Sequence, residues 1–158
     1  MISISGIKYQ KELESLPYFN KNQASILIDK KGKNLDKKLL QLKKKGYLLT
    51  FKNSLYVSYP YYQTANKNLY LEYMANILRS PSYISLEYIL AKESLIPEAV
   101  MSITSLTTKS SRTYQNFLGT FIYKNINKKL FFGYNSELWE GKKIFRATKA
   151  KALFDFLY

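Results

Sequence analysis

NLDKKLLQLKKKGYLLTFKNSLYVSY, residues 34–59, decides the fold of the first part of this chain. It opens with apolar side chains at the i, i+4, i+7 spacing of one buried helix face, namely Leu35, Leu39 and Leu42. Asn34 is a residue type that caps helix N-termini, and Gly46 is the type that most often follows a helix. The spacing therefore predicts a helix over 34–45.

A β-hairpin is predicted directly after this helix. Residues 47–51 and 54–59 are rich in aromatic and aliphatic side chains that favour strands. Lys52 and Asn53 lie between the two runs and are expected to form a tight turn. We therefore expect these two residues at the tip of the hairpin.

Two shorter helical patterns precede the helix at 34–45. One covers 11–19 and the other 22–29, where Asn22 is the expected N-cap. Three short helices followed by a two-stranded hairpin is the order of a winged-helix domain, whose third helix enters the DNA major groove. The sequence therefore predicts a winged-helix DNA-binding domain at 5–60.

The polar face of the third helix is the main candidate site. Its lysines suit contacts with phosphate, whereas Asn34 and Gln41 have the amide geometry that reads an adenine edge. The hairpin tip and the start of the second helix are further candidates for phosphate contacts. The candidate residues for binding double-stranded DNA are Asn22, Gln23, Lys33, Asn34, Lys37, Lys38, Gln41, Lys44, Lys45, Lys52 and Asn53. The alternative is an ordinary solvated helix face in a lysine-rich chain.

The charge of the chain calls for an anionic partner. Its 158 residues carry a formal net charge of +14 together with 15 Tyr and 9 Phe, which indicates a basic globular protein. Nucleic acid, an acidic membrane surface and an acidic protein all remain candidates on charge alone. No apolar stretch approaches the roughly 18 residues of a membrane span, and the start lacks a signal-peptide pattern. We expect a cytoplasmic protein with no membrane partner.

The residue types that are missing limit the chemistry. With no His and no Cys, the common zinc ligand sets and the Ser-His and Cys-His nucleophile pairs are excluded. Neither a glycine-rich dinucleotide motif nor a P-loop occurs. Glu137 and Glu140 are the nearest carboxylate pair, and they have no third partner. We expect no catalytic residue, no metal and no cofactor.

The remainder of the chain, 67–158, is predicted to be a small α+β domain. Its expected order is helices, then an antiparallel sheet, then a C-terminal helix. The helices are expected at 68–79, from after Ser85 as N-cap to before Pro97, and from Thr148 onward. The strands are expected at 100–106, 113–117, 120–125 and 130–134. A linker is expected at 59–66, where a proline and a polar run separate the periodic stretches.

Residues 107–112 form a polar, cationic stretch in this second domain. Lys109 and Arg112 within it are candidates for a second phosphate contact or a partner contact. A plain loop between two strands is the alternative. The weakest alternative hypothesis is a nucleotidyl- or phosphoryl-transfer enzyme that uses these two residues together with a carboxylate-bound metal.

A series of motifs in the second domain resembles the AbiEi family of antitoxins and transcriptional regulators from type IV toxin-antitoxin and phage-defence systems. The motifs are Tyr83-Ile84-Ser85-Leu86-Glu87, Leu95-Ile96-Pro97-Glu98, Ile103-Thr104-Ser105-Leu106-Thr107-Thr108-Lys109, Gly119-Thr120-Phe121, Leu130-Phe131-Phe132-Gly133-Tyr134 and Ala147-Thr148. In the first domain, residues 42–48 followed by a wing are similar to that family's N-terminal winged helix. Lys149-Ala150 departs from the Pro-Glu that is common in the family, whose members usually also continue beyond the last helix found here.

The resemblance implies a repressor that binds inverted repeats in its own promoter and counteracts a nucleotidyltransferase-like toxin encoded beside it. Inverted repeats would require either a dimer or two monomers on successive half-sites. The alternative from another class is an interaction protein that holds an acidic partner, such as a toxin, and has only non-specific affinity for DNA.

Overall fold

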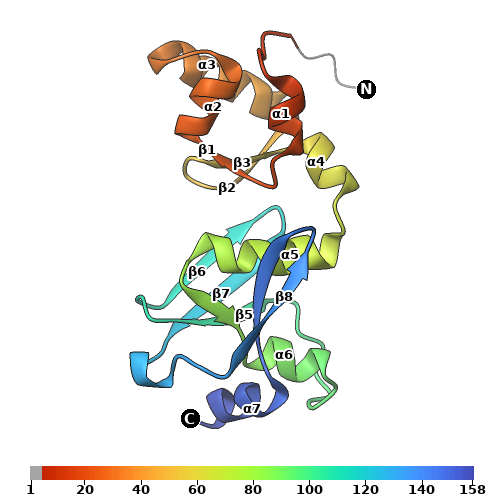
Figure 1. The fold of residues 1–158 in the computed structure, drawn as a ribbon, viewed down its shortest axis with the longest axis vertical. Helices are drawn as coiled ribbons and strands as arrows, with labels where there is room; N and C mark the ends of the chain where they lie inside the picture. The colour runs from red at the N-terminus through yellow and green to blue at the C-terminus, as the bar shows by residue number, and fades with distance from the viewer. Residues whose placement is uncertain (1–4) are drawn as a thin grey trace. The chain divides into compact units, whose positions relative to one another are not determined.

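The computed structural model describes residues 5–158, which form an α+β protein (Figure 1). Over these residues seven α-helices and two sheets are present, one of three antiparallel strands and one of six mixed strands. The chain divides into two compact units, of which the first ends at Asn66 and the second begins at Lys67. None of the helices in this described part is long and apolar enough to cross a membrane.

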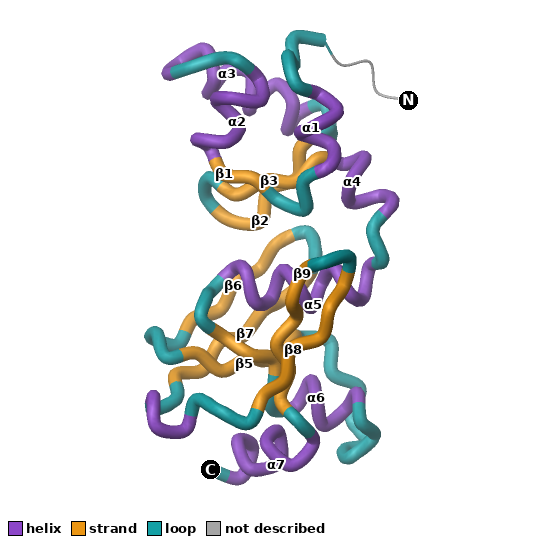
Figure 2. Tube along the Cα trace, viewed as in Figure 1, coloured by secondary structure: helices purple, strands orange, loops and turns teal. Residues whose placement is uncertain are grey.

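The first unit combines short helices with a small antiparallel sheet (Figure 2). In chain order it contains α1 (Gln10–Ser15), β1 (Phe19–Asn20), α2 (Lys21–Ile28), α3 (Gly32–Lys44), β2 (Leu48–Lys52), β3 (Leu55–Ser58) and α4 (Tyr59–Thr64). The strand order is β1-β3-β2, so the hairpin β2–β3 is extended by the short strand between α1 and α2.

The leucine stripe of α3 forms the centre of this unit's core. Leu35, Leu39 and Leu42 are each at most 4% exposed, and they pack in one cluster with residues of α1, β1, α2 and β2. The Tyr47 hydroxyl donates a hydrogen bond of 2.7 Å to the Glu14 carboxylate, which ties the end of α3 to α1. Burial, and then this carboxylate, raise the pKa of Tyr47 above its ordinary value.

The first two helices differ from the sequence prediction at their ends. The helix predicted over 11–19 stops at Ser15 because Pro17 disfavours helical backbone at Leu16, whose ψ is 133°. Phe19 instead lies in β1. Asn22 is not the N-cap of α2: that position is Asn20, whose side chain accepts from the backbone N–H of the third helical residue.

Three further boundaries in this unit need correction. Asn34 is not a cap, because α3 begins two residues earlier, at Gly32, after Lys31 as N-cap. Lys52 is the last residue of β2 and not part of the turn, which is formed by Asn53 and Ser54, the latter at a φ of 61°. The expected linker includes α4, because the Ser58 side chain caps it.

The second unit is built around the six-stranded sheet. It contains α5 (Lys67–Leu78), β4 (Ser82–Ile84), α6 (Glu87–Lys92), β5 (Ile103–Thr107), β6 (Arg112–Asn116), β7 (Gly119–Asn125), the 3-10 helix η1 (Lys128–Leu130), β8 (Tyr134–Trp139), β9 (Lys142–Ala147) and α7 (Lys149–Leu157). The strand order is β6-β7-β5-β4-β9-β8.

The predicted antiparallel sheet is wrong, because two of its strand pairs are parallel. β7 inserts between β5 and β6 and runs parallel to β5, and β9 returns to run parallel to β4. The strand predicted at 130–134 is also wrong, since Leu130 belongs to η1 and only Tyr134 lies in a strand, at the start of β8. Ser85 does not cap α6: Leu86 holds that position, and the Ser85 hydroxyl donates to Asp155.

A buried carboxylate joins three elements of this unit. Glu72 on α5 has a side chain only 1% exposed. It accepts hydrogen bonds from the Tyr88 hydroxyl at 2.9 Å and from Arg146 Nε at 2.6 Å, and its Oε1 lies 2.5 Å from Lys92 Nζ. The exposed Glu137 pairs with the same arginine. This network fastens α5 to α6 and β9.

Candidate functional site

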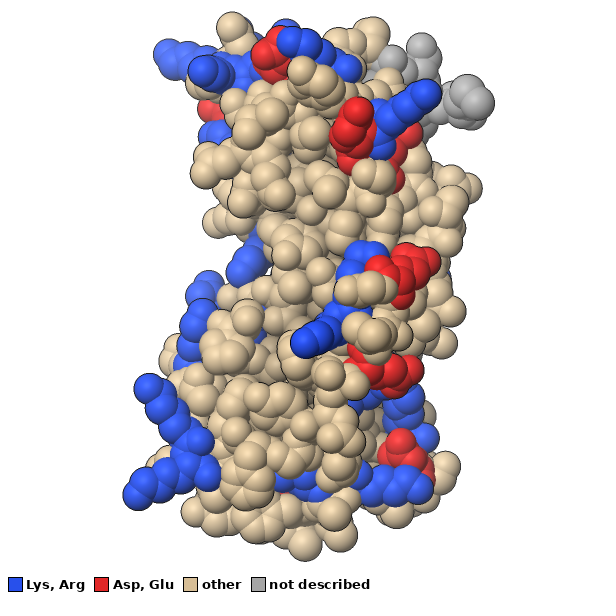
Figure 3. All heavy atoms as spheres, in the orientation of Figure 1, with Lys and Arg blue, Asp and Glu red and all other residues tan. Residues whose placement is uncertain are grey.

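The two faces of α3 have opposite character. The leucine stripe faces the core, while the predicted polar positions face outward. The exposed residues of the candidate site on this helix are Lys33, Asn34, Lys37, Gln41, Lys44 and Lys45, and Lys38 is half-buried. Figure 3 shows basic side chains gathered over α3. The helix therefore presents a lysine-rich surface to solvent.

The acidic residues near this surface form ion pairs with lysines outside α3. Asp36 on α3 pairs with Lys21 at 2.6 Å, and Asp29 at the end of α2 pairs with Lys8 at 3.4 Å. Within residues 5–158, none of the lysines on α3 forms an ion pair. Their mutual repulsion is left to solvent and counterions, which is the condition that favours binding of a polyanion.

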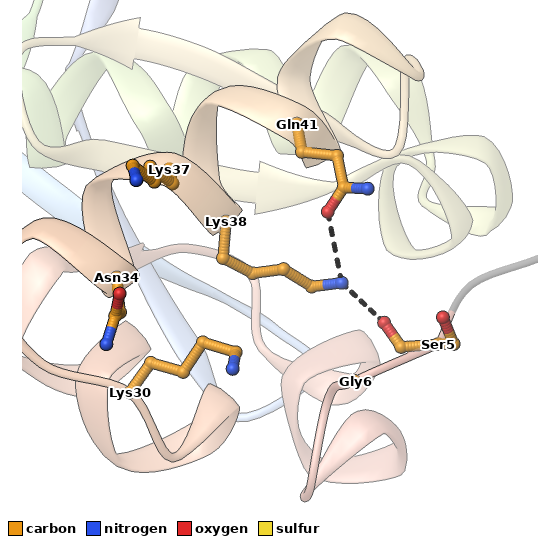
Figure 4. A pocket seen from close by; sticks show the side chains of 7 residues that line it. All are labelled: Ser5, Gly6, Lys30, Asn34, Lys37, Lys38 and Gln41. Atoms are coloured by element: carbon orange, nitrogen blue, oxygen red, sulfur yellow. Dashed lines mark hydrogen bonds between the residues drawn. The ribbon is translucent and has the colours of Figure 1, made fainter.

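A hollow of about 430 Å³ opens beside α3 (Figure 4). It is lined by Ser5, Gly6, Lys30, Asn34, Lys37, Lys38 and Gln41. Lys38 Nζ donates to the Ser5 carbonyl at 2.5 Å and to Gln41 Oε1 at 3.3 Å. Burial, and then the charges of Lys45 and Lys30, lower the pKa of Lys38. The predicted helix residues thus meet the N-terminal segment and the α2–α3 turn.

A second hollow, of about 410 Å³, lies further along the same helix. Its lining consists of Lys37, Leu40, Gln41, Lys44 and Lys45. Leu40 is 51% exposed there, and the sequence reasoning missed it. Its position outside the i, i+4, i+7 stripe was the available signal. An exposed leucine between amide and lysine side chains is suited to contact a thymine methyl group.

Other predicted residues of the first unit lie outside these two hollows. The side-chain oxygen Oε1 of Gln23 accepts from the backbone N–H of Asn20 at 2.9 Å, so this side chain is part of a capping box. Asn22 is exposed in the first turn of α2. Lys52 is half-buried at the end of β2, and Asn53 is exposed in the turn that follows.

In the second unit, Lys109 lies in an ordered loop between β5 and β6. The Asn125 side chain donates to the Lys109 carbonyl at 2.8 Å, and Arg79 donates to the Ser110 carbonyl and hydroxyl at 3.0 and 2.8 Å. Residues 108–111 therefore connect the two strands. Arg112 is the first residue of β6, and its guanidinium lies 5.1 Å from the centre of the Tyr114 ring.

The carboxylates weighed as a catalytic pair each have a cationic partner. Glu137 pairs with Arg146, and Glu140 lies 3.6 Å from Lys142. Over residues 5–158, no three acidic side chains gather in a way that would hold a metal ion.

No protein-family model matches the chain, and no curated protein sequence matches it.

Proposed function

We propose that the chain is a DNA-binding transcriptional regulator whose first unit is a winged helix. The order α1-β1-α2-α3-β2-β3 supports this, since a helix, a short strand, two further helices and a hairpin follow one another. The pairing of β1 with β3 adds a third strand to the hairpin that would serve as the wing. In this proposal α3 enters the major groove and the β2–β3 turn reaches the adjacent backbone.

The observation that carries the proposal is the uncompensated lysine face of α3. Its lysines would neutralise backbone phosphates and release counterions, so affinity would fall steeply with salt. Asn34 is exposed at the start of the helix, with a side-chain amide that suits bidentate contact with adenine. For Gln41 to make the same bidentate contact, its hydrogen bond with Lys38 would first have to break, because the contact with adenine uses the Gln41 side-chain oxygen as well as its nitrogen. Asn34 is therefore the leading base reader.

The resemblance to AbiEi-type regulators suggests which promoter and which protein partner the regulator would bind. The chain would repress its own promoter by binding inverted repeats, as a dimer or as paired monomers. It would also act as the antitoxin of a nucleotidyltransferase-like toxin.

The decisive experiment is a fluorescence titration with the DNA upstream of its gene and with a shuffled duplex, each at two salt concentrations. Preference for the upstream DNA that survives the higher salt supports a sequence-specific regulator. Asn34→Ala is expected to lose about 1–3 kcal/mol of that preference. Lys44→Ala should weaken both duplexes alike and reduce the salt slope by about one. Equal affinity for both duplexes in the wild-type protein would refute the proposal.

A second candidate function, a module that holds an acidic protein, is favoured by one observation. The last helix and the residue after it leave large apolar side chains exposed, namely Leu153, Phe154, Phe156, Leu157 and Tyr158. Exposed apolar groups in one segment are typical of protein contacts. Tight 1:1 binding of the neighbouring gene's product, with no preference between the two duplexes, would favour this function over repression.

A further inference from the structure

We propose that the hollow beside α3 is a seat for a single phosphate group of the DNA backbone, with Lys38 as its fixed cationic ligand. This inference rests on the proposed function and assigns one backbone phosphate of the bound DNA to a specific site on the protein. The seat adds Lys30 and the N-terminal segment to a site that the sequence placed on α3 alone.

Lys38 is held in position before any ligand arrives. An ammonium group has three N–H donors. Two are directed at the Ser5 carbonyl and Gln41 Oε1, at 2.5 and 3.3 Å, so the contacts within residues 5–158 leave one donor for a ligand. The dashed lines in Figure 4 show this arrangement at the edge of the hollow. A lysine whose ammonium is already oriented loses less conformational entropy on binding than a freely moving one.

Lys30 brings a second cation from outside the helix. Its carbonyl accepts from the Ser25 hydroxyl at 2.8 Å, and its N–H donates to the Ser25 carbonyl at 3.2 Å. These bonds fix the backbone of the turn between α2 and α3. From this turn the Lys30 side chain extends toward the hollow (Figure 4). Lys37 supplies a third cation from the helix. Neither Lys30 nor Lys37 forms an ion pair within residues 5–158, so no carboxylate there competes with an anion for these two lysines.

The residues that line the hollow favour an oxyanion over other ligands. Three are lysines, two are amides, and the remaining two are Ser5 and Gly6, so the described lining contains no acid. Phosphate oxygens accept from ammonium and amide donors alike. An anion between the lysines would also relieve the repulsion that helps to lower the pKa of Lys38.

The phosphate is assigned to a DNA backbone because the hollow shares Lys37 and Gln41 with the second hollow along α3. A ligand that follows both hollows must be extended and repeatedly charged. Free phosphate has the same oxyanion chemistry and serves as the probe for the seat itself.

The first arm of the test is an NMR titration of the full chain with inorganic phosphate, at constant ionic strength maintained with chloride. We expect saturable shifts of the Gly6 and Lys30 amides. Lys38→Met should weaken phosphate binding about tenfold, because one charged hydrogen bond is lost. Lys38→Arg should retain most of the binding. The matched control is Lys43→Met, which removes one exposed charge from the same helix outside the hollow and should bind phosphate as the wild type does.

The second arm uses duplexes in which single phosphates are replaced by neutral methylphosphonates. One position per half-site should cost the wild-type protein about tenfold in affinity, and that cost should disappear in Lys38→Met. Unchanged phosphate binding by Lys38→Met, or equal loss in Lys43→Met, would overturn the seat. So would phosphate binding with no sensitive position in the duplex. Equal affinity for upstream and shuffled DNA would refute the sequence-specific regulator, while the methylphosphonate result would still decide the seat.

Discussion

Replacing Glu72 with glutamine should destabilise the second unit far more than the same change at Glu137. Both carboxylates bind Arg146, but the Glu72 side chain is 1% exposed and that of Glu137 is 60% exposed. Breaking a buried ion pair by removing one partner costs about 3–5 kcal/mol. We expect the lower end for Glu72→Gln, about 3 kcal/mol, because Arg146 keeps Glu137 and the amide keeps the side-chain shape. An exposed pair contributes about 0–1 kcal/mol, so Glu137→Gln should have little effect.

The single tryptophan makes the measurement specific to this unit. Trp139 lies in β8 and is the only Trp of the chain, so its fluorescence follows unfolding of the second unit alone. For a unit of this size, about 3 kcal/mol corresponds to a fall in Tm of about 12–24 °C. A loss below about 1 kcal/mol for Glu72→Gln, or equal losses for the two variants, would refute the argument that burial decides the contribution of these pairs.

Three further predictions concern the helices and one tyrosine. Asn20→Ala should lower the free energy of unfolding of the first unit by about 1 kcal/mol in a urea titration followed by circular dichroism, whereas Asn22→Ala should change it by less than about 0.5 kcal/mol. In the same assay Leu39→Ala should cost about 2–5 kcal/mol and Leu40→Ala very little, and equal costs would contradict the assigned faces of α3. Tyr123 has a pKa raised by burial, so the stability that its neutral form contributes is present below pH 10 and is lost as the pH rises above that ordinary tyrosine value. Phenolate absorbance, compared with that of Tyr123→Phe, should show no ionisation of this tyrosine near pH 10 while the protein is folded.

The sequence predicted α3 well because one physical signal dominates it. A leucine every three to four residues on an otherwise charged segment leaves a single helix face that is able to enter a core. The hairpin after it was equally clear, since a glycine ends the helix and two apolar runs follow. Helix starts were less certain, because asparagine at either Asn20 or Asn22 satisfies the same capping preference. Only the position of Gln23, three residues after Asn20, distinguishes the two through the capping box.

The strand order of the six-stranded sheet in the second unit could not be predicted from the sequence, for a topological reason. Strand periodicity identifies strands but not the strands with which they pair. The insertion of β7 between β5 and β6 depends on contacts between residues far apart in the sequence, which a local pattern does not encode. β8 gives no alternating signal because it is an edge strand, and Asn135, Ser136, Glu137 and Leu138 within it are all exposed. The contact between Lys38 and Ser5 joins residues 33 positions apart, and no local sequence pattern predicts such a contact.

Composition and geometry together restrict how the proposed DNA contact would select its bases. All three arginines of the chain, Arg79, Arg112 and Arg146, belong to the second unit, so the first unit lacks the guanidinium fork that most often reads guanine. On the exposed face of α3 the side chains able to contact base edges are the lysines, the amides of Asn34 and Gln41, and the apolar Leu40, while the exposed Asp36 is paired with Lys21. Amides favour adenine, and an apolar side chain favours the methyl group of thymine. If α3 enters the major groove, its specificity should therefore centre on A·T pairs, while its lysines supply affinity that depends on salt and hardly on sequence.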